Sequence, residues 1–214
     1  MHTAPDHEKS VQNFMQLFNR LKNIDLILGS QSPRRKALLQ DAGFRFRTQV
    51  IPTPEEFPSN LTPEEIAAFL CRQKAEPFKN QLNKNSLLIT ADTIVVKDQQ
   101  ILNKASDEKE AFEMLSLLNG TRHKVITGVC LSTHNHSESF HETTSVFFRT
   151  LTDEEINWYI HHYKPFDKAG AYGIQEWIGM IGVKKIEGCF YNVMGLPVAA
   201  LFSQMKTFVH EHFS

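Results

Sequence analysis

The sequence has few cysteines, no long apolar run and no excess of charge of either sign. Its three cysteines, Cys71, Cys130 and Cys189, are odd in number and far apart. This spacing fits neither a disulfide framework nor a zinc-binding motif, and it predicts a protein of the reducing cytoplasm. The formal net charge of −1 excludes the broad positive field with which proteins capture nucleic acid.

Two further absences limit the kinds of partner that we expect for this protein. No apolar run approaches the roughly 20 residues that a membrane-spanning helix needs. Residues 1–20 are mixed and polar, so we expect no signal peptide there. We therefore expect neither a membrane nor a nucleic acid as partner. Histidine pairs stand at His134/His136, His161/His162 and His210/His212. Because none is joined by a second ligand pair at a metal-binding spacing, we favour solvated histidines over a structural metal site.

The composition is that of an ordinary globular protein, 41% hydrophobic and 22% charged over 214 residues, which suits one domain or two closely joined lobes. Capping residues and helical spacing predict helices over residues 8–21, 33–42 and 152–163, two more that open at Thr62 and Ser106, and a last one that ends near Phe208. Apolar runs predict strands over residues 26–28, 87–96, 123–132, 140–149 and 178–186. This alternation predicts an α/β fold, and the hairpin over residues 123–149 makes its sheet mixed.

A segment rich in serine and basic residues follows the first predicted strand, Ser30-Gln31-Ser32-Pro33-Arg34-Arg35-Lys36. The start of a helix there offers unpaired N–H groups and the positive end of the helix dipole, and arginine side chains fit phosphate oxygens. Three cations in a row oppose that dipole, which favours an anion ligand over the alternative, a solvated basic first turn. Neighbouring helical side chains point about 100° apart, so we expect only one of Arg34 and Arg35 to contact the ligand directly.

Asp92 interrupts a predicted strand of apolar residues. An unpaired ionised carboxylate buried there would be destabilising by several kcal/mol. Such a residue is typical of the mouth of a site, where it binds a metal or acts as a base. The alternative is a residue at a bulge or strand end that reaches water.

Three other features are weaker when taken singly. Lys74 ends an apolar stripe formed with Ile66 and Leu70, and Lys104 stands just beyond the strand that carries Asp92. A lysine at such a position commonly just reaches solvent. The segment Asp167–Gln175 has two glycines in four residues, which is typical of a backbone that approaches something closely. Gln175 carries a donor and an acceptor suited to a base edge, although a plain tight loop is the alternative.

Together these segments resemble the Maf family, also called septum-formation-inhibitor-like proteins, of the inosine triphosphate pyrophosphatase fold superfamily. The matching blocks follow the family order at residues 28–35, 91–95, 119–128, 167–175 and 186–197, and they span nearly all of residues 24–205. The resemblance implies a mixed twisted central sheet with flanking helices and two lobes around a cleft. It places the Maf-like domain at residues 23–214 and leaves residues 1–22 as an N-terminal helical extension without an assigned role.

The resemblance implies hydrolysis between the α and β phosphates of a nucleoside triphosphate, with a divalent cation, Mg²⁺ or Mn²⁺. Asp92 would be the catalytic acid or base and a metal ligand, and Glu55 would be a second metal ligand. The substrate-binding and specificity residues would be Ser30, Arg34, Arg35, Lys74, Thr93, Lys104 and Gln175. A homodimer is also suggested by the family. The Lys168–Gln175 segment is similar to that of the branch acting on dTTP and UTP.

This chain departs from the family pattern at two relevant positions. Gly29 stands where the family usually has alanine, and Pro54 stands where it usually has aspartate, so only Glu55 remains of an expected acidic pair. We predict a pyrophosphatase for dTTP and UTP. The alternatives are a pyrophosphatase for purine or modified nucleotides such as N7-methyl-GTP, and a non-catalytic nucleotide-binding regulator of cell division. Mere binding needs no buried carboxylate facing a phosphate, so the full set of Asp92, Lys74, Lys104 and Glu55 argues against the regulator.

Overall fold

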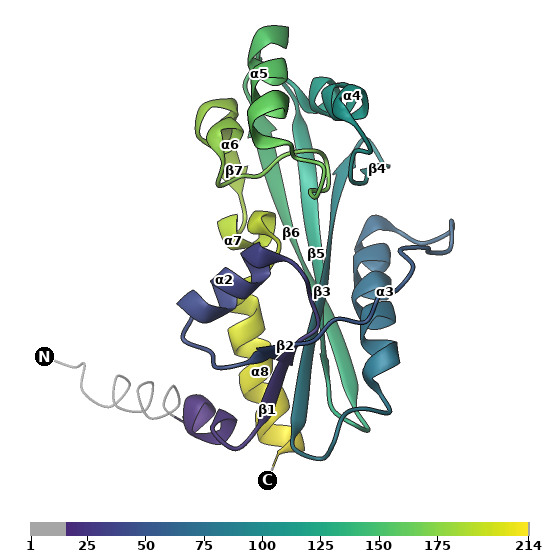
Figure 1. Cartoon of the computed structure of the whole chain (residues 1–214), viewed down its shortest axis with the longest axis vertical. Helices are drawn as coiled ribbons and strands as arrows, with labels where there is room; N and C mark the ends of the chain where they lie inside the picture. The colour runs from purple at the N-terminus through teal and green to yellow at the C-terminus, as the bar shows by residue number, and fades with distance from the viewer. Residues whose placement is uncertain (1–15, 214) are drawn as a thin grey trace, which may run out of the picture.

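The computed structural model describes residues 16–213 and is built around one seven-stranded mixed sheet (Figure 1). The strands are β1 (Asp25–Leu28), β2 (Arg47–Thr48), β3 (Ser86–Lys97), β4 (Gln100–Leu102), β5 (Arg122–Ser132), β6 (Ser137–Phe148) and β7 (Val183–Glu187). Their order is β2-β1-β3-β5-β6-β7, with β4 pairing β3. Strands β1, β2 and β3 run parallel, whereas the pairs from β3 to β7 are antiparallel.

Helices cover both faces of this sheet (Figure 1). They are α2 (Pro33–Asp41), α3 (Pro63–Ala75), the 3-10 helix η1 (Glu76–Phe78), α4 (Glu108–Leu118), α5 (Asp153–Tyr163), α6 (Trp177–Gly182), α7 (Phe190–Met194) and α8 (Val198–His212). Helix α3 lies on one face, α2 and α8 lie on the other, and α4, α5 and α6 gather at one end of the strands (Figure 1). The predicted α/β class with a mixed sheet and flanking helices is confirmed. Across residues 16–213, no helix has the length and apolar character to cross a bilayer.

The predicted helix starts at Ser32, Thr62 and Thr152 are confirmed by their caps, whereas α4, predicted to open at Ser106, is capped by Asp107 one residue later. Ser32 caps α2, and Thr62 and Thr152 each form a capping box, with Glu65 and Glu155 respectively. These pairs satisfy backbone N–H groups that would otherwise lack a partner, which is why the local sequence suffices to predict them. The last helix runs to His212, beyond the predicted end near Phe208. Of the predicted helix over residues 8–21, residues 16–21 are helical and the rest lies outside the described residues.

The predicted strand over residues 178–186 was wrong in its first half. Residues 177–182 form helix α6, and the strand β7 begins only at Val183. Ile178 and Gly182, four residues apart, are buried on one side of this helix, whereas Met180 is 69% exposed. A short apolar run has no periodicity that distinguishes a buried strand from one and a half helical turns.

Helix α3 packs unusually close to the sheet at Gly128 of β5. A Cβ atom on Gly128 would lie 2.1 Å from the carbonyl oxygen of Ala67 in α3, so only glycine fits there. Gly128 is the direct partner of Asp92 in the β3–β5 ladder, and the two positions therefore share one face of the sheet. The close approach brings α3 against the face that carries Asp92.

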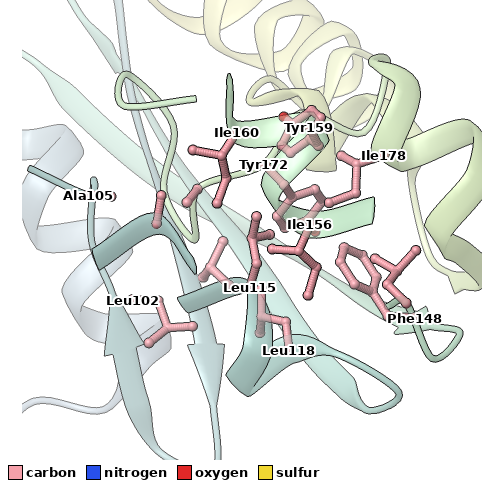
Figure 2. Close-up of a cluster of buried hydrophobic side chains, with 14 of the residues drawn as sticks. Leu102, Ala105, Leu115, Leu118, Phe148, Ile156, Tyr159, Ile160, Tyr172 and Ile178 are labelled. Atoms are coloured by element: carbon pink, nitrogen blue, oxygen red, sulfur yellow. The ribbon is translucent and has the colours of Figure 1, made fainter. Parts of the chain in front are cut away.

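A separate apolar core holds the end of the molecule formed by α4, α5 and α6 (Figure 2). Leu115, Leu118, Ile156 and Tyr159 are buried there, together with Tyr172 from the segment after α5. This core fixes the residues just before α6, which form one wall of the site described next.

Candidate active site

The site lies where the sheet is interrupted beside β3. Strand β1 pairs with β3 only through Ser86–Ile89, and β4 pairs only with Val95–Lys97. Between them, within the described residues, 90–94 have a neighbouring strand only on the β5 side. A cleft of about 570 Å³ opens at this gap. It stands at the carboxyl end of β1, which is where ligands usually bind in open α/β sheets.

The gap lets both faces of β3 contribute to one cleft. Successive strand residues point to opposite faces. Asp92 accordingly faces α3, and Thr93 faces the side of α2, yet both line the cleft. The cleft also receives Arg34 and Arg35 from the start of α2. The predicted catalytic carboxylate and the predicted anion-binding helix therefore share one cavity.

Asp92 is 7% exposed and forms an ion pair with Lys74, which projects from the last turn of α3. The same Lys74 ammonium lies 3.0 Å from Oε1 of Glu55, and the Lys104 ammonium lies 3.2 Å from that oxygen. These four side chains form one alternating chain of charges along the cleft. The resemblance placed these residues in a phosphate and metal pocket, and the structure brings them together.

Glu55 is the more exposed of the two carboxylates, with 47% of its side chain accessible. Partial burial opposes ionisation, but the ammonium groups of Lys74 and Lys104 outweigh it and hold the pKa of Glu55 below its ordinary value. Glu55 therefore stays ionised and available to a cation at neutral pH.

The two arginines of α2 differ in their partners. Arg35 donates to the carbonyl of Gly195 at 2.8 Å, to Oγ1 of Thr93 at 3.0 Å and to Oγ of Ser30 at 3.3 Å. Burial lowers its pKa, against the attraction of Asp92. Arg35 is thus held by protein acceptors. The expectation that only one of the two arginines contacts the ligand directly stays a prediction.

Arg34 instead pairs across the cleft with Asp167 at 2.8 Å. Burial opposes ionisation of Asp167, but its bonds to Lys168 and Arg34 outweigh burial and lower the pKa of Asp167. The ionised carboxylate of Asp167 is thus paired with Arg34, the side chain expected to bind a phosphate. Sequence reasoning did not select Asp167 or Lys168 as site residues. The available signal was the adjacent pair of opposite charges at the start of the glycine-containing segment.

A buried polar network supports Thr93 from behind. Oγ1 of Thr93 lies 2.9 Å from Oγ1 of Thr127, which donates to the carbonyl of Asn192 at 3.1 Å. The Asn192 amide donates to Val125 and to Thr144, and Asn192 is fully buried. Asn192 belongs to a block that matched the family, but its role in holding β5, β6 and α7 together could be read only from the fold.

Gln175 is exposed and lines the cleft, together with other residues of the segment just before α6. The segment that carries it is held at Ala169, which forms an isolated bridge with Lys104, and at Gly170, which packs against Val95 in a left-handed conformation with φ of +67°. The predicted close approach of this segment is therefore confirmed at Gly170.

Every predicted site residue lines this one cleft: Ser30, Arg34, Arg35, Glu55, Lys74, Asp92, Thr93, Lys104 and Gln175. The histidine pairs are elsewhere. In the described part of the chain, the only group of three possible metal ligands is Glu138, Glu211 and His212, at the surface and outside the cleft. The preference for histidines without a structural metal stays a prediction.

Five cationic and three anionic side chains line the cleft, so its walls carry a net positive charge although the whole chain does not. Helix α2 adds the N–H groups of its first turn. Fold and site together define an α/β protein with a cleft for a polyanionic ligand beside carboxylates able to hold a cation. Comparison with known proteins places the chain more closely.

The family model described as Maf-like protein matches residues 25–208. The dTTP/UTP pyrophosphatase of Porphyromonas gingivalis is 47% identical over 195 residues, which cover 90% of this chain and 98% of that protein. The dTTP/UTP pyrophosphatase of Cytophaga hutchinsonii is 49% identical over 188 residues, 88% of this chain and 86% of that protein. The solved Ham1 protein of Staphylococcus aureus is similar at 14% identity and a TM-score of 0.41, over 87% of this chain and 98% of that one. This chain belongs to the family of Maf-like proteins.

Proposed function

We propose that this protein is a nucleoside triphosphate pyrophosphatase that hydrolyses dTTP and UTP to the monophosphate and pyrophosphate. The observation that carries the proposal is the position of Asp92, a buried carboxylate beside Lys74, Glu55 and Lys104 in a cleft that also holds Arg34. The relatives named as dTTP/UTP pyrophosphatases support the choice of substrate. The alternative purine or modified-nucleotide substrates have no comparable support.

The cofactor that we propose is Mg²⁺ or Mn²⁺, and the donor set fits it. The carboxylates of Glu55 and Asp92 both accept from the Lys74 ammonium, so their oxygens already share one cationic partner, whose place a divalent cation would take once Lys74 turned to the polyphosphate. Hard divalent cations prefer such oxygens, and Mg²⁺ commonly uses one or two protein carboxylates and completes its shell with phosphate oxygens and water. Two carboxylates are therefore enough to hold the cation, even though Pro54 replaces the aspartate that the family usually has. The cation would be held by Glu55 and Asp92.

The bound cation would stabilise the charge on the leaving pyrophosphate and make a bound water more acidic. The protein's own groups do the rest. Arg34 exchanges Asp167 for a phosphate, while Ser30 and the N–H groups that begin α2 bind other phosphate oxygens. Lys74 and Lys104 balance the charge of the polyphosphate. Asp92 either holds the cation or accepts a proton from water at its Oδ atoms, and both roles need it at this place in the cleft.

We assign the choice of base to Gln175, with Thr93. The amide of Gln175 offers one acceptor and one donor side by side. Uracil and thymine present an N3–H donor beside carbonyl acceptors, so one amide can pair with both groups. Cytosine presents an N4–H donor beside an N3 acceptor, and adenine presents N6–H beside a ring-nitrogen acceptor. An amide held in one orientation, with its oxygen at the N3–H position, is therefore mispaired with both. This assignment predicts discrimination against dCTP as well as against purine nucleotides.

The test is a panel of nucleoside triphosphates with Mg²⁺ or Mn²⁺, in which monophosphate, pyrophosphate and orthophosphate are measured separately. We expect dTTP and UTP to give the highest kcat/KM, with pyrophosphate as the second product. Asp92→Asn should abolish turnover while nucleotide binding survives, because Lys74 and Arg34 remain. Release of orthophosphate would exclude the α–β bond, a purine preference would contradict the role of Gln175, and binding without turnover would favour the non-catalytic regulator.

We also propose a cytoplasmic location, supported by the free thiols of Cys71 and Cys130, which are both buried, and of Cys189. The homodimer suggested by the family stays a prediction, which light scattering on the purified protein would test.

A further inference from the structure

Glu176 follows Gln175 directly but turns away from the cleft. Gln175 is exposed on the cleft side, whereas 17% of the Glu176 side chain is accessible and Glu176 does not line the cleft. Its carboxylate accepts a hydrogen bond from the hydroxyl of Tyr159 and lies 3.1 Å from the ammonium of Lys168. A charged group is thus held behind the segment that carries the proposed base-reading residue.

The partners of this carboxylate are themselves buried. Tyr159 is fully buried in the core of Figure 2, and Lys168 is 8% exposed. Burial and the neighbouring Glu176 raise the pKa of Tyr159, so its hydroxyl keeps the proton that it donates. A buried carboxylate is tolerated only with such compensation, and loss of its charge would leave the Lys168 ammonium without one of its two counter-ions.

The backbone of the segment is shaped around Glu176. The N–H of Gly173 donates to the Tyr159 hydroxyl at 3.0 Å. A Cβ atom on Gly173 would lie 2.6 to 2.9 Å from three atoms of the Glu176 carboxyl group, so the glycine is needed for the carboxylate to enter. One carboxylate therefore fixes Gly173 through Tyr159 and Lys168 through an ion pair, on the N-terminal side of Gln175.

A chain of ion pairs connects the Glu176 carboxylate to Arg34, at the side of the cleft where we expect the phosphates. Lys168 bridges Glu176 and Asp167, at 3.1 Å and 2.7 Å, and Asp167 pairs with Arg34. The segment that would read the base is thus tied to the arginine that would bind phosphate.

We propose that Glu176 is a positioning residue for substrate selection: through Tyr159 and Lys168 it holds the Asp167–Gln175 segment so that Gln175 meets the base. The inference rests on the proposed function, because it gives the reason why Gln175 stands where a pyrimidine edge can be read. Glu176 does not touch the substrate and acts through the residues that it holds.

The test compares kcat/KM for dTTP and for dCTP in the whole protein. Glu176→Gln keeps the shape of the side chain and removes its charge, and Tyr159→Phe removes the shared hydroxyl. We expect the dTTP-to-dCTP ratio to fall about fivefold or more in both variants, which is the worth of one misplaced hydrogen bond. Leu82→Ala is the control, because it loosens a separate core that contains no residue of the Asp167–Gln175 segment, and it should leave the ratio unchanged even as the melting temperature falls.

Hydrogen exchange gives a second readout that does not depend on activity. Glu176→Gln should speed exchange in a peptide covering residues 167–176, including the amide of Gly173, while β5 stays protected. Unchanged exchange in that peptide, or a lower melting temperature with an unchanged substrate ratio in both variants, would overturn the proposal. If the wild-type protein shows no preference for dTTP and UTP, the proposed function fails, and exchange still decides whether Glu176 holds the segment.

Discussion

The ammonium of Lys74 and the carboxylate of Asp92 form an ion pair inside the cleft, between α3 and β3, where their side chains are 18% and 10% accessible. Removing one partner of such a pair leaves the other charge poorly solvated, whereas removing both does not. The stability of the single and double variants therefore measures what the ion pair contributes to folding, independently of its part in catalysis.

We therefore predict that Lys74→Met lowers the free energy of unfolding by about 2 kcal/mol. Asp92→Asn combined with Lys74→Met should lower it by clearly less than the two single changes added together, as measured by urea unfolding. Lys79→Met is the control, because its pair with Glu76 is 59% accessible on both sides and should be worth less than about 1 kcal/mol. Additive effects in the cycle would mean that the pair contributes nothing to stability.

Glu55 and Glu56 give a matched pair for the cation site. Both are exposed, but only Glu55 lines the cleft and contacts Lys74 and Lys104. We predict that Glu55→Gln raises the Mg²⁺ concentration for half-maximal activity about tenfold or more, since a lost carboxylate weakens metal binding at least as much as a lost supporting residue.

Glu56→Gln should leave that concentration unchanged, because it is the backbone carbonyl of Glu56 that accepts from Gln73. The measurement is a titration of chelator-treated protein with Mg²⁺ at saturating dTTP. Equal shifts in the two variants would remove Glu55 from the proposed cation site.

The parts of this fold that sequence predicted well are those with local causes. Thr62 and Thr152 mark the starts of α3 and α5 in the sequence. Each capping box is a local contact, formed with a glutamate three residues further along the chain. Asp92 could be selected because an ionised carboxylate within a buried strand is destabilising unless it has a partner or a function. The predicted split into an extension over residues 1–22 and a domain over residues 23–214 stays a prediction.

The parts that sequence could not predict depend on distant contacts. The gap beside residues 90–94 follows from where β1 and β4 end, and neither end is marked near Asp92 in the chain. Gly128 matched a family block, yet only the register shows that it lies opposite Asp92 and admits α3. Glu176 stands next to a predicted site residue and gave no signal, because its partners Tyr159 and Lys168 are brought to it only by folding.

Gly29 stands where the family usually has alanine, and the neighbouring Thr90 explains how the difference is accommodated. A Cβ atom on Gly29 would lie 2.7 Å from the Cγ2 methyl of Thr90, whose hydroxyl donates to the carbonyl of Cys71 at 2.6 Å. The threonine methyl thus fills the space that an alanine would use.

Gly29→Ala should accordingly lower the free energy of unfolding by about 1 to 3 kcal/mol through overpacking. Thr90→Ser removes the methyl and keeps the hydroxyl, so Gly29→Ala combined with Thr90→Ser should recover about 1 kcal/mol relative to the sum of the single changes. Thermal unfolding of the four proteins measures this coupling. A double variant that is as unstable as that sum would show that Thr90 does not set the size of residue 29.

His123 predicts a specific dependence of stability on acid. It is 2% exposed, its Nε2 lies 2.7 Å from the hydroxyl of Tyr172, and its Nδ1 has no hydrogen-bond partner among residues 16–213. Burial, together with the charge of Lys97, lowers the pKa of His123 to about 3, so the ring is neutral in the folded protein.

An unfolded histidine titrates near pH 6.5, so between about pH 6.5 and pH 3 only the unfolded chain binds this proton. Stability from His123 is therefore complete above about pH 6.5 and falls by about 1.4 kcal/mol for each pH unit below it. In urea unfolding from about pH 7 to about pH 4.5, His123→Gln should lack this part of the slope, because glutamine can still accept from Tyr172 but does not titrate. The exposed His161, changed to Gln, should keep the full slope. If His123→Gln and the wild type lose stability equally on acidification, the buried ring is not the group that senses the acid.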